Sequence, residues 1–90
     1  MRKHIGTLEW LEGVLAVRRI RRSGRCRPKD ARALGLHVVR REMMYYVATL
    51  EDLEAETGGY NRAVGYSTSH DAYASITNAV LRGWITGRAD

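Results

Sequence analysis

Apolar residues recur at intervals of three and four along most of this 90-residue chain, and this spacing constrains the fold more than any other feature. Such intervals place side chains on one face of an α-helix, whereas a half-buried strand alternates every second residue. The pattern covers three segments, separated by Ser23-Gly24 and Pro28 and by Gly58-Gly59. The sequence therefore predicts an all-α fold: a single domain over residues 1–90, built as a small bundle of three to four helices.

The first and last predicted helices have recognisable ends. The first covers about residues 8–22 and ends at Gly24, which can adopt the left-handed conformation of a helix cap. The last covers residues 70–86, with Ser69 as its N-cap and Gly87 as its C-terminal cap. Both have an apolar face that can pack in a bundle.

The middle predicted helix is long and has two weak points. It covers residues 29–57 and begins at Pro28, whose missing N–H is tolerated in a first helical turn. Gly35 and the capping signal at Thr49 are the two places where it can break. Residues 43–47 are all apolar and also fit a short strand, an alternative that stays open. The apolar seam of this helix has the spacing three, four, three, four, three and consists of Leu36, Val39, Met43, Tyr46, Leu50 and Leu53.

A basic run spans the end of the first predicted helix, the connector and the start of the second. Residues 18–32 contain eight Lys or Arg side chains and one acid, Asp30. Residues 1–41 hold twelve Lys/Arg against three Asp/Glu (+9), and residues 42–90 hold three against seven (−4). Like charges this close repel one another, and an anionic partner relieves that cost. The sequence thus predicts a basic helix-loop-helix corner at 18–32 that binds phosphate or carboxylate groups, because the arginine fork matches both.

Residues 31–37 (Ala-Arg-Ala-Leu-Gly-Leu-His) resemble the first helix and turn of helix-turn-helix DNA-binding domains. Ala31, Gly35 and Leu36 match the packed alanine, the turn glycine and the following aliphatic residue of that family. A buried aliphatic residue usually follows about six positions after the glycine, where this chain has Arg41. The resemblance implies that a recognition helix presents four residues to the major groove: His37, Val38, Arg40 and Arg41.

No pattern in the sequence points to catalysis, a metal or a cofactor. Ser69-His70-Asp71 has the residue types of a catalytic triad, but consecutive helical residues point about 100° apart and cannot converge. Cys26 is the only cysteine, which indicates a reducing compartment and excludes an internal disulfide. No apolar stretch approaches the roughly 18 residues of a membrane span. We therefore expect a non-enzymatic cytoplasmic protein with no catalytic residues, no metal, no cofactor and no membrane partner.

These observations favour a nucleic-acid-binding protein that contacts mainly the phosphate backbone. The predicted binding residues are Arg18, Arg19, Arg21, Arg22, Arg25, Arg27, Lys29, Arg32, Arg40 and Arg41. Candidates for secondary contacts are Tyr60, Arg62 and Tyr66, which fall in a predicted loop over residues 58–69. A homodimer is compatible with the apolar seam.

An alternative function of a different class also fits the sequence. The chain can be a small phage or mobile-element accessory protein that inhibits or modulates a host protein or a nucleoprotein complex. Anti-defence proteins of the anti-CRISPR type and transcription modulators are examples of this class. In that case the arginines bind an acidic protein surface, and exposed aromatic residues anchor the contact.

Overall fold

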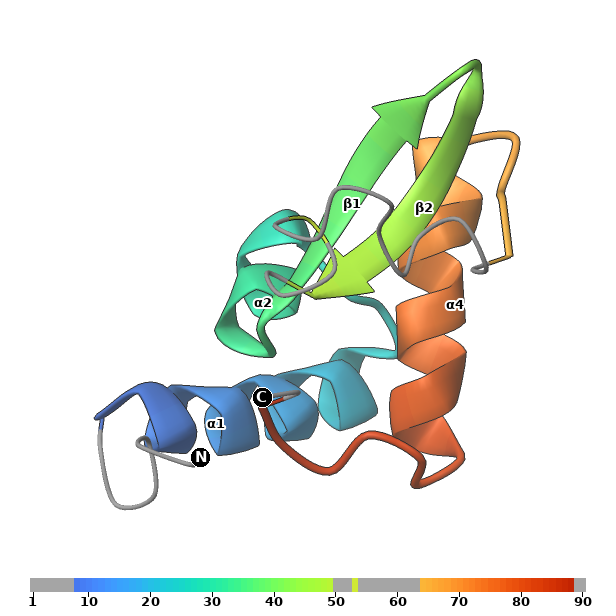
Figure 1. The fold of residues 1–90 in the computed structure, drawn as a ribbon. Coiled ribbons are helices and arrows are strands. Elements are labelled where there is room, and N and C mark those ends of the chain that lie inside the picture. Colours follow the sequence, from blue (N-terminus) through green and yellow to red (C-terminus); the bar gives the residue numbers. More distant parts are fainter. Residues whose placement is uncertain (1–7, 50–52, 54–63, 89–90) are drawn as a thin grey trace.

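The computed structural model describes residues 8–49, 53 and 64–88, and this part of the chain is a mixed α/β fold. Helices pack around one face of a two-stranded antiparallel sheet (Figure 1). In chain order the elements are α1 (Leu8–Ser23), α2 (Pro28–Ala33), β1 (Leu36–Arg41), β2 (Met44–Thr49) and α4 (Ser69–Leu81). The predicted all-α bundle is therefore wrong.

The error lies in the middle of the chain, where a helix was predicted over residues 29–57. The helix α2 stops at Ala33, and Gly35 has a φ of +78°, which reverses the chain into β1. The alternative, a short strand over 43–47, is confirmed: the strand β2 covers Met44–Thr49, so only its bounds differ. A strand is favoured here because the segment is rich in β-branched and aromatic residues, namely Val38, Val39, Tyr45, Tyr46 and Val47.

The turn between the two strands has no sequence signal of the usual type. Glu42 and Met43 connect β1 to β2, and their φ angles are +51° and +72°. Two successive positive φ values belong to the type I′ turn, which normally takes Asn-Gly because other side chains are strained there. The turn is therefore strained at these two residues, and the packing of the rest of the hairpin has to offset the cost in free energy.

The register of the hairpin places one face on the core. Val38 pairs with Val47 and Leu36 with Thr49, so these four side chains share a face. Leu36 is buried, and Val38 and Val47 pack against the buried cluster. At the outer edge of β2, Tyr45 and Tyr66 exchange backbone hydrogen bonds of 2.7 and 2.8 Å. This bridge ties the segment before α4 to the sheet.

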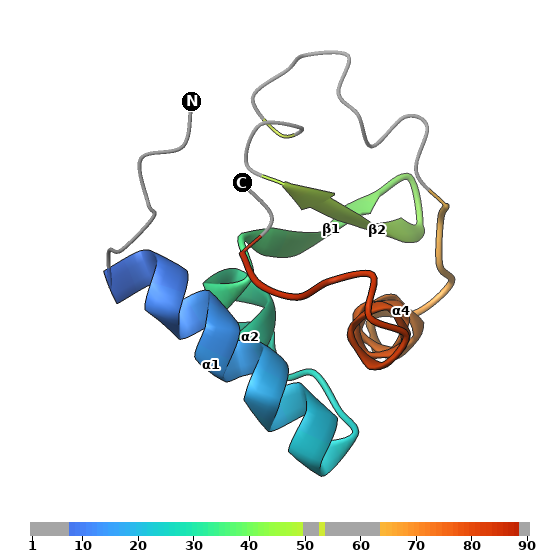
Figure 2. The same cartoon turned by 90° about the horizontal axis from the view of Figure 1, so that it is seen from below.

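The core lies where the three helices and the hairpin meet. Helix α2 lies between α1 and the hairpin, and α4 flanks both (Figures 1 and 2). The largest fully buried side chains come from α1, from α4 and from the turn after α2: Ile20, Leu34, Ile76 and Val80. Burying an aliphatic side chain of this size stabilises the folded state by roughly 1.5–3 kcal/mol.

Helix α1 agrees with the prediction, and α4 does not at its C-terminal end. Gly24 follows α1 with a φ of +74°, and its N–H donates to the Ile20 carbonyl at 2.7 Å, as expected of a left-handed cap. Helix α4 ends at Leu81, several residues before the predicted end at Gly87. Gly83, with a φ of +81°, is the glycine at this end.

The N-terminal cap of α4 lies one residue before the predicted Ser69. The Thr68 hydroxyl accepts from the Asp71 N–H at 3.1 Å. The predicted loop over 58–69 is described only from Val64 onward, so Gly58-Gly59 lies outside the described residues.

The chain after α4 crosses α1 at a glycine. A Cβ atom added to Gly13 would lie 2.9 Å from the Arg88 backbone nitrogen, so any other residue would push the two segments apart. The Arg88 guanidinium also donates to the Ala33 carbonyl of α2 at 3.5 Å. The C-terminal segment thus connects α1 with α2 and passes close to both (Figure 1).

Candidate anion-binding corner

The eight cationic residues of 18–32 lie where α1, a four-residue connector and α2 meet, and all eight are exposed. We call this set the basic corner; it consists of Arg18, Arg19, Arg21, Arg22, Arg25, Arg27, Lys29 and Arg32. The structure therefore displays these charges on ordered backbone rather than on a free tail. Four of them occupy the last turns of α1, where cations suit the negative end of the helix dipole.

The buried carboxylate of Asp30 holds the two helices of the basic corner together and serves as its anchor. Its carboxylate is 4 % exposed and accepts two hydrogen bonds. The Arg19 Nε–H donates to Oδ1 at 2.9 Å, and the Arg27 backbone N–H donates to Oδ2 at 3.2 Å. The first bond joins α1 to α2, and the second caps the start of α2. Arg19 is consequently fixed in place by an internal contact, although it was predicted as a binding residue.

A hollow of about 250 Å³ opens beside this anchor. Besides Ser23, its lining comprises four cationic side chains and one carboxylate, which gives a formal charge of +3. Arg19 and Asp30 form an ion pair with each other. The other three cationic side chains of the lining, Arg22, Arg27 and Lys29, can bind an anion. Guanidinium and ammonium groups that converge on one hollow are the typical environment of a bound phosphate.

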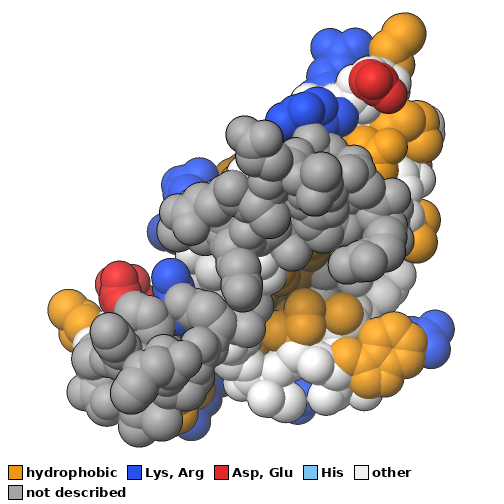
Figure 3. Space-filling view, viewed as in Figure 1, with side chains coloured by type: hydrophobic (Ala, Val, Ile, Leu, Met, Phe, Trp, Pro, Cys, Tyr) orange, Lys and Arg blue, Asp and Glu red, His pale blue; other side chains and the backbone are white. Residues whose placement is uncertain are grey.

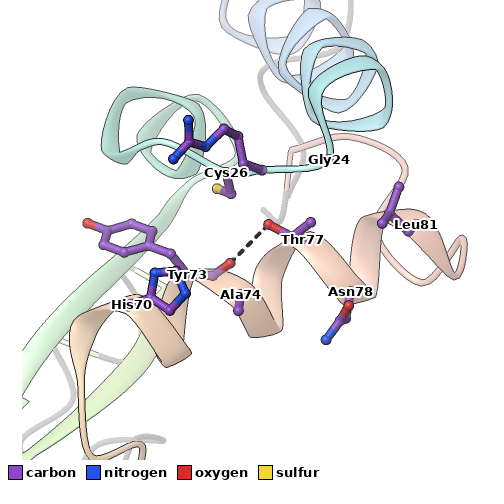
Figure 4. Close-up of a pocket in the computed structure, with 9 residues that line it drawn as sticks. Gly24, Cys26, His70, Tyr73, Ala74, Thr77, Asn78 and Leu81 are labelled. Atoms are coloured by element: carbon purple, nitrogen blue, oxygen red, sulfur yellow. Dashed lines mark hydrogen bonds between the residues drawn. The ribbon is translucent and has the colours of Figure 1, made fainter.

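A second hollow of about 340 Å³ lies on the other side of the connector, between Gly24–Cys26 and α4 (Figure 4). Arg25 of the basic corner lines this hollow and not the first one. On α4, the Thr77 hydroxyl donates to the Tyr73 carbonyl at 3.2 Å, so that hydroxyl is already engaged. Arg25 is therefore separated from the cationic side chains that line the first hollow.

Cys26, in the same connector, is an unreactive thiol at neutral pH. Burial, together with the nearby negative charge of Asp30, raises the pKa of Cys26 to about 11. Its Sγ lies 3.6 Å from the Arg27 carbonyl oxygen. The neighbouring arginines do not lower this pKa because their side chains are exposed while the thiol faces the core.

Arg40 and Arg41 do not extend the basic corner. They end β1 at the tip of the hairpin, far from α1 (Figure 1), next to Glu42 and Met43. In the space-filling view this tip carries basic, acidic and hydrophobic side chains side by side (Figure 3). The Arg40 guanidinium stacks on the Tyr45 ring at 5.9 Å from its centroid.

The interpretation of residues 37–41 as a recognition helix is wrong. His37 and Val38 lie half-buried in the strand β1 (Leu36–Arg41). This segment is therefore not a helix that could insert into a major groove. Among the candidates for secondary contacts, Tyr66 is half-buried and bridges to Tyr45. Tyr60 and Arg62 lie outside the described residues.

The role of Asp30 was missed in the sequence, although a signal for it exists. Asp30 stands three residues after Arg27 and two after Pro28, which is the position of an acid in a capping box. The sequence interpretation counted it only as the single negative charge in a basic run. Ser23, which also lines the first hollow, was read only as part of the stop after α1.

No three His, Cys, Asp or Glu side chains among the described residues cluster in a way that would hold a metal ion. No helix within the described ranges has both the length and the apolar composition needed to cross a membrane.

Comparisons with known proteins add no family to this description. No protein-family model matches the sequence, and no curated protein or solved structure shows significant similarity to the chain.

Proposed function

We propose that this protein binds nucleic acid through the phosphate backbone and that the basic corner is the contact surface. The observation that carries the proposal is the hollow beside Asp30, toward which Arg22, Arg27 and Lys29 converge. These three side chains supply donors for phosphate oxygens, while Arg19 is held by Asp30 and keeps the backbone in position.

A polymer suits this surface better than a single small anion. Exposed cations continue beyond the hollow on both helices and on the connector: Arg18, Arg21, Arg25 and Arg32. A chain of phosphates can neutralise several of them at once, and the release of counterions then adds to affinity. Phosphate contacts carry no sequence information. We therefore expect binding that depends steeply on salt and weakly on base sequence.

The test is a salt titration of binding to a fluorescent duplex and to a fluorescent single strand, followed by anisotropy. The corner variant Arg22→Gln/Arg27→Gln/Lys29→Gln should bind at least about tenfold more weakly than the wild type. Its slope of log affinity against log salt should also be smaller by two to three units, because each lost phosphate contact removes about 0.9.

The matched control removes the same number of charges elsewhere. Arg40→Gln/Arg41→Gln/Arg82→Gln also lowers the net charge by three but leaves the basic corner intact. Its affinity should fall far less than that of the corner variant. Equal losses in the two variants would show that net charge alone attracts the polymer. Either of two results would overturn the proposal. One is a wild type that shows no salt-sensitive binding, and the other is a pull-down in which a single protein partner survives nuclease treatment.

A further inference from the structure

The hollow between Gly24–Cys26 and α4, which we call the α4 hollow, has a different lining from the hollow beside Asp30. The hollow beside Asp30 has four cationic side chains among six lining residues, whereas the α4 hollow has one, Arg25, among nine. The other lining residues of the α4 hollow carry rings, small or aliphatic groups and uncharged polar groups. Such a lining is typical of a site for a small organic ligand, and a volume of about 340 Å³ lies at the lower end of the range for such sites.

Two rings line the α4 hollow about one helical turn apart. Tyr73 is half-buried and packs against the buried cluster, so its position is held by the core. His70 is exposed and precedes Tyr73 by three residues, which places both side chains on the same side of α4 (Figure 4). Tyrosine and histidine rings are among the groups on which proteins stack unpaired bases of nucleic acids.

Two polar side chains complete the lining needed for a base. Arg25 adds a guanidinium plane from the connector, and such planes also stack on bases. The exposed Asn78 adds an amide that can both donate and accept a hydrogen bond at a base edge. The α4 hollow therefore offers stacking surfaces and polar partners, but few charges for a second phosphate.

The two hollows lie on either side of the connector. Gly24 and Cys26 line the α4 hollow, and their chain neighbours Ser23 and Arg27 line the hollow beside Asp30. A nucleic-acid strand that crosses the connector can thus place a phosphate on one side and a base on the other.

We propose that the α4 hollow binds an unpaired base, so that the nucleic acid is single-stranded where it contacts the protein. This inference rests on the proposed function, because the basic corner supplies the phosphate contacts that bring the strand to the hollow. A base that is paired in a duplex is stacked inside the double helix and cannot enter the hollow. Stacking is tolerant of base identity, which is consistent with a weak dependence on base sequence.

Two strands with the same number of phosphates separate the contribution of the base from that of the backbone. One is a fluorescent strand of about 12 thymidines, and the other is the same strand with abasic sites at its central positions. The wild type should bind the thymidine strand at least about fivefold more tightly than the abasic strand, because the stacking of one base contributes at least that factor.

Variants of the α4 hollow test whether this difference arises there. Tyr73→Leu and His70→Ala should each abolish most of it, while affinity for the abasic strand and for a duplex stays unchanged. Tyr73→Phe keeps the ring and should bind like the wild type. Because His70 is exposed, His70→Ala keeps the test valid even if Tyr73→Leu loses its fold. The matched control is Tyr45→Leu, which removes a half-buried tyrosine of β2 that does not line the hollow.

The outcomes distinguish this inference from the proposed function. The variant Arg22→Gln/Arg27→Gln/Lys29→Gln should weaken binding to both strands by the same factor. Equal affinity of the wild type for the two strands, with steep salt dependence, would overturn the base site and leave the basic corner in place. A base-dependent difference that persists in Tyr73→Leu and His70→Ala, or that Tyr45→Leu reduces equally, would also overturn the base site. A wild type that binds neither strand would overturn both proposals.

Discussion

The basic corner and the β-hairpin are neighbours in the chain, but their structures have different origins. In the basic corner, each turn of the backbone has a cause within a few residues: Gly24 ends α1, Pro28 begins α2, and Asp30 caps it. In the hairpin, the turn residues Glu42 and Met43 oppose the conformation that they adopt. The corner is thus determined by local interactions, and the hairpin by its packing against the helices.

The basic corner and the hairpin also differ in how they arrange their cationic side chains. The corner directs cationic side chains to solvent from both of its helices while one buried acid joins the helices. The hairpin places its two arginines at the tip, where Arg40 rests on Tyr45. Similar residues therefore form an extended cationic surface in one region and only two neighbouring arginines in the other. Three substitutions and one labelling experiment follow from this contrast, from the largest expected effect on stability to the smallest.

Asp30→Ala should lower the free energy of unfolding by about 2–3 kcal/mol. The change removes a buried acceptor of two hydrogen bonds, one of them from a charged group. We expect less than the full value of a buried ion pair because the Arg19 side chain is 46 % exposed. Urea denaturation measures the loss. Glu12→Ala, which removes an exposed acid from α1, should change stability by less than about 0.5 kcal/mol. An equally small effect of Asp30→Ala would show that the corner does not need its anchor.

Glu42→Asn/Met43→Gly should raise the free energy of unfolding by about 1–2 kcal/mol. Both positions have positive φ, and Asn-Gly adopts the type I′ turn without the strain of a longer side chain. The two side chains are exposed, so their loss removes little packing. Thermal or urea unfolding checks the gain. A destabilised variant would mean that the turn is held by side-chain contacts of Glu42 or Met43.

Gly24→Ala applies the converse change to the basic corner and should cost about 1 kcal/mol. Gly24 has a φ of +74°, and nothing lies within 4 Å of an added Cβ atom. The cost therefore comes from backbone strain alone, without a steric clash. Unfolding measurements should show the loss, while the nucleic-acid binding that we propose for the hollow beside Asp30 should persist. A neutral substitution would indicate that the connector can relax.

Cys26 should react slowly with iodoacetamide in the folded protein. Of the four predictions, this one involves the smallest change in stability, because ionisation of the thiol has no effect near neutral pH. Because burial raises its pKa from 9.0 to about 11, the thiolate is on the order of a hundred times scarcer than in the unfolded chain at pH 8. The unfolded thiol loses its proton first as pH rises, so stability is unaffected below about pH 9 and decreases between about pH 9 and 11. Mass spectrometry of labelled protein, with and without urea, measures the rates. Equal rates would show that the thiol is accessible.

Part of this fold could be predicted from single residues. The extent of α1 follows from its apolar spacing and from Gly24, and the start of α2 follows from Pro28. The end of α4 was misplaced because both Gly83 and Gly87 can cap a helix, and only Gly83 has the positive φ of a glycine at a helix end. A local signal is reliable when one residue provides it and ambiguous when two do.

The candidate site shows the same limit. The set of cations between 18 and 32 was visible in the sequence, but which of them line the two hollows was not. Whether an arginine is held by an acid or faces solvent depends on which helices touch, as Arg19 and Asp30 show. For the same reason, Arg40 and Arg41 were grouped with the basic corner although the hairpin carries them away from it.

The sequence by itself contains the eight positive charges of residues 18–32, and it determined two local features of the backbone: where α1 ends and how α2 begins. Each depends on interactions within about four residues, which the order of amino acids contains directly. Only the tertiary structure decided that residues 36–49 are strands. Apolar intervals of three and four fit a helix, β-branched and aromatic residues fit a strand, and the choice depends on burial. The hairpin buries Leu36 and packs the half-buried Val38 and Val47 against the core, and this burial outweighs the strain at Glu42 and Met43.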